Sequence, residues 1–108
     1  MTDLDWDRSF ALEQAGDDEE MLAELLVLYC DSSAADLVRI IDGLAAGDPV
    51  AVADAAHSIK GASASLGVEG VRKIVDELER KGRAGDLAQA EGLAARLGVL
   101  LAAFVGLQ

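Results

Sequence analysis

The fold class can be inferred from residues 18–49, which read DEEMLAELLVLYCDSSAADLVRIIDGLAAGDP. Apolar residues recur here at i, i+3, i+4 and i+7 in two successive quartets: Leu22, Leu25, Leu26, Tyr29 and Leu37, Ile40, Ile41, Leu44. This spacing is typical of a buried stripe on an α-helix. Residues 31–34 between the quartets are weakly apolar and compatible with a kink, but the pattern as a whole predicts one long helix.

Glycine and proline mark the end of this helix and the start of the next. Gly47 is suited to end the long helix, Asp48 to cap the following one, and Pro49 to occupy its first position. Similar glycine stops recur along the chain. The sequence therefore predicts five helices, over about residues 5–15, 18–46, 49–66, 68–82 and 86–106.

Two aspartates are predicted to begin helices through capping boxes. Asp17 precedes Glu20 by three residues, and Asp86 precedes Gln89 by the same spacing. In a capping box these two side chains satisfy the free backbone N–H groups of the first turn. We therefore expect Asp17 to cap the second helix and Asp86 to cap the fifth.

The short connections between the predicted helices make successive helices antiparallel. The expected fold is all-α, an antiparallel up-down four-helix bundle with a short additional N-terminal helix. A chain of 108 residues is long enough for one hydrophobic core and too short for two ordinary domains. We therefore expect residues 1–108 to form a single domain, which as a closed bundle would be a monomer.

Charge and composition argue against several functional classes. The formal net charge of −11 disfavours binding to nucleic acid or to an anionic membrane, because both are polyanions. The longest strongly apolar tract, Leu97–Leu107, is too short to span a bilayer. The acidic N-terminus is unlike a secretory signal, and the single Cys30 allows no internal disulfide. These features favour a cytoplasmic location.

The sequence offers no recognisable metal or hydrolase site. Asp3, Asp5 and Asp7 have the alternate spacing that opens a calcium loop, but Arg8 and Gln14 stand where such a loop needs Gly and Glu. These acids are better explained as caps of the first helix. One histidine and one cysteine cannot form a closed zinc site without several carboxylates, and no second histidine is present for a serine triad.

One cluster, within the predicted third helix, indicates a functional site. At 100° per residue, the buried stripe of this helix comprises Val52, Ala56, Ile59, Ser63 and Leu66. His57 points roughly 140° away from the stripe and Gly61 roughly 180° away, so both are expected to face solvent. Lys60 lies on the same flank, and Ala53 and Ala64 complete a surround of small side chains.

The exposed glycine is the informative member of this cluster. Glycine in a helix interior costs about 1 kcal/mol relative to alanine. Gly61 is explained if a bulky group must approach His57 along the helix surface. Because Lys60 is within reach, that group is expected to be anionic, and we interpret the cluster as a phosphate seat on a histidine. The alternative is an ordinary surface histidine on a helix of small residues.

The run His57–Gly67, HSIKGASASLG, resembles the signature of histidine-containing phosphotransfer (HPt) domains. The resemblance extends over nearly the whole chain, including Asp48-Pro49 and Leu78-Glu79. It implies a carrier in multistep two-component signalling that moves a phosphoryl group between aspartates of receiver domains. Such carriers have no kinase activity of their own.

The resemblance also implies roles for individual residues. His57 would be phosphorylated, Lys60 would neutralise charge on the phosphate, and Gly61 would leave room for it. The supporting residues would be Glu79, Ser63 and Arg83. The residues that dock the partner would be Ala53, Asp54 and Ala64. The receiver domain would supply Mg²⁺, so neither a cofactor nor a metal site is expected in this chain.

The spacing along the chain also places Glu79 near the histidine. The third and fourth helices are expected to turn near Gly67, with His57 ten residues before it and Glu79 twelve residues after it. An antiparallel pair brings both side chains to about the same level. The resemblance adds that a Gln or Glu here orients the imidazole. The alternative is an exposed Glu79 paired with Arg80 or Arg83.

Three functions follow as hypotheses. The first is a phosphorelay carrier that accepts a phosphoryl group on His57 from a receiver aspartate or a hybrid kinase and passes it to another receiver. Its partners would be response-regulator receiver domains and a sensor or hybrid histidine kinase. The second is the phospho-acceptor domain of a chemotaxis-type histidine kinase, which the absence of an ATP-binding core in 108 residues disfavours. The third is a helical adaptor that uses the same face without phosphorylation.

Overall fold

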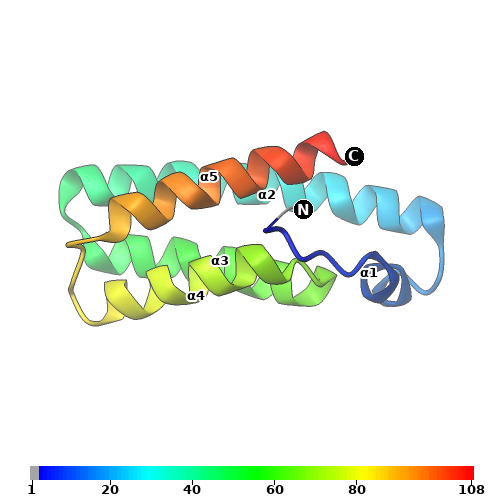
Figure 1. Ribbon diagram of the computed structural model, residues 1–108, viewed down its shortest axis with the longest axis horizontal. Helices are drawn as coiled ribbons and strands as arrows, with labels where there is room; N and C mark the ends of the chain where they lie inside the picture. Colours follow the sequence, from blue (N-terminus) through cyan, green and yellow to red (C-terminus); the bar gives the residue numbers. More distant parts are fainter. Residues whose placement is uncertain (1–2) are drawn as a thin grey trace.

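The computed structural model describes residues 3–108, which form five α-helices and, within that range, no strand (Figure 1). The helices are α1 (Arg8–Gln14), α2 (Glu19–Ala46), α3 (Pro49–Leu66), α4 (Glu69–Arg83) and α5 (Ala90–Gly106). The predicted all-α class, a four-helix bundle with a short N-terminal helix, is confirmed. Among residues 3–108, no helix combines the length and the apolar character that a membrane span requires.

Helices α2 to α5 run alternately up and down and form two layers (Figure 1). α2 and α5 lie in one layer and contact each other, while α3 and α4 form the other. α3 packs against both α2 and α4, and α1 packs against α2 and α3 at the end where α2 extends beyond α5. α3 is therefore covered on two sides and has one exposed side left for function.

Capping residues explain the boundary between α2 and α3. Asp18 and Asp48 precede α2 and α3, and their carboxylates accept hydrogen bonds from backbone N–H groups of the first turn. Both helices end at a glycine in the left-handed conformation, Gly47 with φ +64° and Gly67 with φ +71°. The boundary predicted from Gly47 and Asp48 is confirmed.

The first two helices start later than the sequence pattern predicts. α1 begins at Arg8 rather than near residue 5, because Asp5 has a φ of +47° and the carboxylate of Asp7 caps the helix. The predicted capping by Asp17 is wrong. Its φ of +60° is left-handed, whereas a capping residue needs the extended backbone that Asp18 has.

The fifth helix also starts later than predicted, at Ala90. Asp86 accepts a hydrogen bond from the backbone N–H of Ala88 at 3.0 Å, within the turn that links α4 to α5. Gln89 precedes the helix and makes no side-chain capping bond. The predicted capping box of Asp86 and Gln89 is therefore wrong, because these residues are needed for the connection between the two helices.

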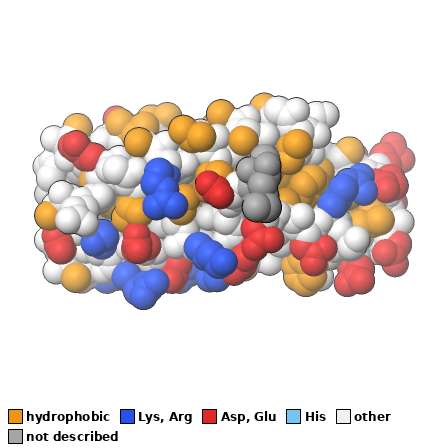
Figure 2. All heavy atoms as spheres, viewed as in Figure 1, with side chains coloured by type: hydrophobic (Ala, Val, Ile, Leu, Met, Phe, Trp, Pro, Cys, Tyr) orange, Lys and Arg blue, Asp and Glu red, His pale blue; other side chains and the backbone are white. Residues whose placement is uncertain are grey.

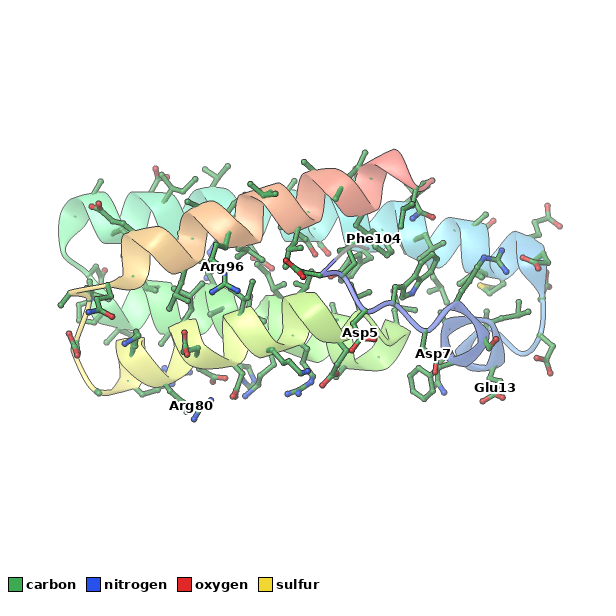
Figure 3. The ribbon with its side chains drawn as sticks, viewed as in Figure 1. Asp5, Asp7, Glu13, Arg80, Arg96 and Phe104 are labelled. Atoms are coloured by element: carbon green, nitrogen blue, oxygen red, sulfur yellow. The ribbon has the colours of Figure 1, made fainter. Side chains whose placement is uncertain are left out.

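The core is centred on Phe104, which points from α5 into the interior (Figure 3). Its ring meets Trp6 and Tyr29 edge to face, with centroid distances of 4.8 and 5.2 Å. Burial raises the pKa of Tyr29 to about 12, so the hydroxyl stays protonated at neutral pH. That hydroxyl shares a 2.8 Å hydrogen bond with Ser63 of α3, which joins α2 to α3 inside the bundle.

α2 continues as one helix through residues 31–34, as the periodicity predicts. For one residue of the predicted buried stripe the prediction is wrong, because Ile41 is 51% exposed. Ile41 faces the groove between α2 and α5, where the two helices leave apolar side chains uncovered.

α3 and α4 approach each other closely near Gly82. A Cβ atom at this position would lie 2.7 Å from the carbonyl oxygen of Pro49 and 2.8 Å from the Cβ of Ala53. Only glycine allows this approach without displacing backbone. The close packing joins the outer sides of α3 and α4 into one continuous surface, on which His57 and Glu79 lie.

Candidate functional site

His57 lies in the middle of α3 on its exposed side. Its side chain is 64% exposed, and Nδ1 lies 2.8 Å from Oε2 of Glu79 in α4. A carboxylate can only accept a hydrogen bond, so Nδ1 carries the proton and donates it. In the neutral ring this leaves Nε2 unprotonated, with a free electron pair.

Glu79 connects the residues of the site. Its side chain is only 12% exposed, and Oε1 lies 2.5 Å from Nζ of Lys60. Burial alone would raise the pKa of Glu79. The hydrogen bond and charge of Lys60, with smaller contributions from His57, outweigh burial and hold that pKa below its ordinary value of 4.5. Glu79 is therefore ionised at neutral pH, accepts a hydrogen bond from His57 and forms an ion pair with Lys60.

Lys60 also approaches a residue that the sequence analysis did not include, Asp76. Its Nζ is 3.6 Å from Oδ1 of Asp76, whose other oxygen accepts from Arg80 at 2.7 Å. The hydrogen bond to Glu79 raises the pKa of Lys60, which stays cationic. The signal for Asp76 was present: Lys60 lies three residues after His57, and Asp76 three residues before Glu79 on the antiparallel partner.

Beside His57 the surface of α3 is open. Gly61 is exposed, and a Cβ atom added there would meet no heavy atom within 4 Å. Ala64 is also exposed, three residues further along. Packing within this chain therefore does not require a glycine at position 61. This agrees with the prediction that Gly61 faces solvent and leaves room for an incoming group.

Asp54 and Arg83 form an ion pair across α3 and α4 next to this open surface. The guanidinium of Arg83 lies 2.9 Å from Oδ1 of Asp54, and both side chains are about half exposed. The same guanidinium lies 3.5 Å from Oε2 of Glu79. Of the two arginines considered for Glu79, Arg83 approaches it, while Arg80 points outward and binds Asp76 (Figure 3).

Two residues predicted for the site lie in the interior instead. Ala53 is fully buried where α3 meets Gly82 of α4, so the prediction that it docks a partner is wrong. Ser63 is also fully buried and shares its hydrogen bond with Tyr29. It stabilises the contact between α2 and α3, and any support that it gives to the site acts through this packing.

The acidic N-terminal residues do not gather around a common point. Asp7 caps α1, and within residues 3–108 no group of three His, Cys, Asp or Glu side chains is arranged to hold a metal ion. The site is thus an exposed histidine oriented by a carboxylate, with a cation and an open glycine beside it.

Comparison with known proteins agrees with this geometry. A family model described as Hpt domain matches residues 24–106, and the chain therefore belongs to the Hpt family of phosphorelay histidine phosphotransfer carriers. Members of this family interact with receiver domains and histidine kinases and are carriers rather than kinases. The predicted function as a phosphorelay carrier is confirmed.

Among solved structures, the chain is similar to histidine-containing phosphotransfer protein B (HptB) from Pseudomonas aeruginosa PAO1. The two share 27% sequence identity with a TM-score of 0.86, over 93% of this chain and 87% of that chain. A search of curated protein sequences gave no match.

The ionised state of Glu79 gives a pH-dependent prediction. A carboxyl group whose pKa is lowered by folding contributes stability above its ordinary pKa, and this contribution is lost as the pH falls through the lowered value. The free energy of unfolding of the wild type should therefore exceed that of Glu79→Gln at neutral pH, and the difference should shrink below pH 4.5. Urea denaturation at a series of pH values measures it, with Glu77→Gln on the same helix as the matched variant. A difference that stays constant down to low pH would contradict the assigned ionisation.

Proposed function

We propose that His57 accepts the phosphoryl group on Nε2 from an aspartyl phosphate of a receiver domain, or from a hybrid kinase, and passes it to another receiver. The observation that carries this proposal is the 2.8 Å hydrogen bond from Nδ1 to Glu79, which leaves Nε2 as the free nitrogen. The open surface at Gly61 supports it, because a receiver must bring its own active site against the imidazole.

The chemistry needs no proton transfer at the attacking nitrogen. A bond forms between Nε2 and phosphorus while the bond from phosphorus to the aspartyl oxygen breaks, and the leaving carboxylate keeps the electron pair. The imidazole becomes cationic as it gains the phosphoryl group. Glu79 stabilises this positive charge through the hydrogen bond at Nδ1, and it keeps the ring in one orientation.

Lys60 assists by neutralising negative charge. Its Nζ binds Glu79 at 2.5 Å, three residues along the helix from His57. A phosphoryl group on the imidazole would compete with Glu79 and Asp76 for this cation. Phosphoryl transfer depends mainly on positioning and charge stabilisation. We therefore assign to Lys60 the role of neutralising negative charge on the transferred phosphoryl group.

Lys60→Ala should slow phosphotransfer without abolishing it. Removing one donor to a developing anion costs a hundredfold or more in enclosed active sites, and for this lysine, whose side chain is 29% exposed on an open surface, we expect about tenfold. Single-turnover transfer from a phosphorylated receiver at low and high salt measures the effect. A rate equal to wild type at both salt concentrations would remove Lys60 from the mechanism.

Docking of the receiver is assigned to the exposed surface around His57, formed by Gly61, Ala64 and the Asp54–Arg83 ion pair.

In this proposal the receiver supplies Mg²⁺ and the chain has no kinase activity of its own. We further propose that the chain acts in the cytoplasm as a monomer. We also propose that it binds neither nucleic acid nor membranes, because its net charge of −11 would repel these polyanions.

The test is incubation of the chain with a phosphorylated receiver domain, followed by measurement of acid-labile phosphate. We expect phosphate to appear on the chain and to move on to a second receiver. If no acid-labile phosphate ever forms, the carrier role fails and an adaptor that binds without phosphorylation is left.

A further inference from the structure

A second surface lies on the layer opposite the one that carries His57. Helices α2 and α5 leave a set of apolar side chains exposed, which we call the α2/α5 face: Val27, Ala34, Val38, Ile41 and Ala45 on α2, and Ala95, Val99, Ala102 and Val105 on α5. No charged residue occurs from Leu97 to Gln108. Figure 2 shows hydrophobic side chains along the upper edge of the molecule, whereas charged side chains dominate over α4. Contiguous apolar surface of this kind marks interaction sites.

This face is hollowed along its length. Two cavities of about 440 and 240 Å³ lie between α2 and α5, and a third of about 690 Å³ adjoins them at the end near α1, where Trp6, Arg8 and Glu19 also line it. Leu37 and Gly98 line the first two, and Cys30 and Val105 line the second and third, so together they form one groove. The lining residues of α2 run from Glu19 to Ala45, which at 1.5 Å per residue gives roughly 40 Å, so a helix of about 20 residues fits within the groove.

The flank of the groove along α2 is acidic. At 100° per residue, Glu24, Asp31 and Asp42 fall within roughly 20° of one another, just beside the apolar stripe. All three are exposed, and the part of the chain that the structure describes offers none of them a cation within ion-pair distance. The single base of α2, Arg39, is paired with Asp36. The flank therefore carries negative charge that this chain does not neutralise.

We propose that the α2/α5 face docks an amphipathic helix of a partner protein, with aliphatic side chains along one stripe and Lys or Arg residues on the flank next to α2. The length and apolar lining of the groove match the stripe, and the acidic flank matches the basic residues. A second copy of this chain is disfavoured as the occupant, because it would bring the same acidic flank against itself. Docking here leaves His57 accessible, so a receiver and the helical partner can bind together.

The test uses a synthetic 18-residue helical peptide with Leu at i, i+3, i+4 and i+7 and Lys along one flank. One comparison peptide replaces every Leu with Ser and keeps the lysines, and another replaces every Lys with Glu. NMR titration of the ¹⁵N-labelled chain should show saturable shifts confined to α2 and α5. The two comparison peptides should bind at least about tenfold more weakly, a loss of about 1.4 kcal/mol or more.

Variants of the chain distinguish specific binding in this groove from nonspecific electrostatic attraction between a basic peptide and an acidic protein. Ile41→Lys and Ala102→Arg should weaken binding of the Leu/Lys peptide at least about tenfold. Val50→Lys replaces a similarly exposed valine, 62% against 51% for Ile41, at the start of α3 and should leave binding unchanged. Shifts centred on α3 and α4, equal binding of the Glu peptide, or no saturable binding would overturn the proposal. Light scattering that shows a dimer abolished by Ala102→Arg would also overturn it, since a second copy would then occupy the face.

Discussion

Replacing His57 with Gln is expected to abolish phosphoryl acceptance and to leave the fold almost unchanged. Glutamine offers no nucleophilic ring nitrogen, so phosphorylation by a receiver should fall below detection. The side chain is 64% exposed and makes one hydrogen bond, to Glu79. Surface substitutions of this kind change the free energy of unfolding by about 0.5 kcal/mol or less. Urea denaturation, circular dichroism and transfer from a phosphorylated receiver should be measured on the same preparation.

Ser58→Ala is the matched variant for this experiment, because Ser58 is the exposed neighbour of His57 on α3. It should accept phosphate at the wild-type rate. Acid-labile phosphate on His57→Gln would show that another residue is the acceptor. A large loss of stability in His57→Gln would mean that the histidine has a structural role that its exposure does not indicate.

At Gly61, stability and function should change in opposite directions. Gly61 is exposed inside α3 and a Cβ atom there meets no neighbour within 4 Å, so Gly61→Ala should raise the free energy of unfolding by up to about 1 kcal/mol. Gly61→Gln keeps the helix but occupies the surface over which the receiver approaches. Because displacement of reacting groups by about 1 Å can cost a hundredfold in rate, we expect transfer to Gly61→Gln to slow by about that factor.

Gly92 of α5 provides the comparison, since it is also exposed with no heavy atom within 4 Å of an added Cβ and belongs to the opposite layer. Gly92→Gln should leave transfer unchanged. Single-turnover kinetics and chemical denaturation on both glutamine variants measure the two effects. If Gly61→Gln transfers phosphate at the wild-type rate, the receiver does not approach over this turn of the helix.

Sequence spacing placed His57 and Glu79 at the same level of two neighbouring helices, and the resemblance to HPt domains added the contact between them. Both residues lie on helices joined by a short turn at Gly67, so counting residues on either side of the turn gives the register. The openness of Gly61 followed from the angle it makes with the buried stripe. Both predictions depended on local geometry, in which α-helices vary little.

The burial of Ala53 could not be predicted in this way. A single buried stripe describes a helix with one neighbour, whereas α3 packs against both α2 and α4. Its second buried side depends on the close approach at Gly82, which is a property of the assembled pair. Ser63 is buried as its place in the predicted stripe requires, but its hydrogen bond to Tyr29, 34 residues away, depends on the assembled bundle and was not predicted.

The helix starts were missed for a different reason. Asp17 and Asp86 both have the spacing of a capping box, but each belongs to a connection whose path depends on where the next helix must begin. The neighbouring Asp18 offers the same carboxylate one residue later with extended backbone. Where two aspartates are adjacent, as here, sequence alone does not distinguish which one caps.

The central claim is that Nε2 of His57 takes the phosphoryl group while Nδ1 stays bonded to Glu79. The most direct measurement is long-range ¹H–¹⁵N NMR of the imidazole before and after phosphorylation by a receiver domain, which is unambiguous because His57 is the only histidine in the chain. We predict a proton on Nδ1 in both states and phosphorus on Nε2 in the phosphorylated state. Phosphorus on Nδ1, or a phosphorylated chain with an unchanged imidazole spectrum, would contradict the account.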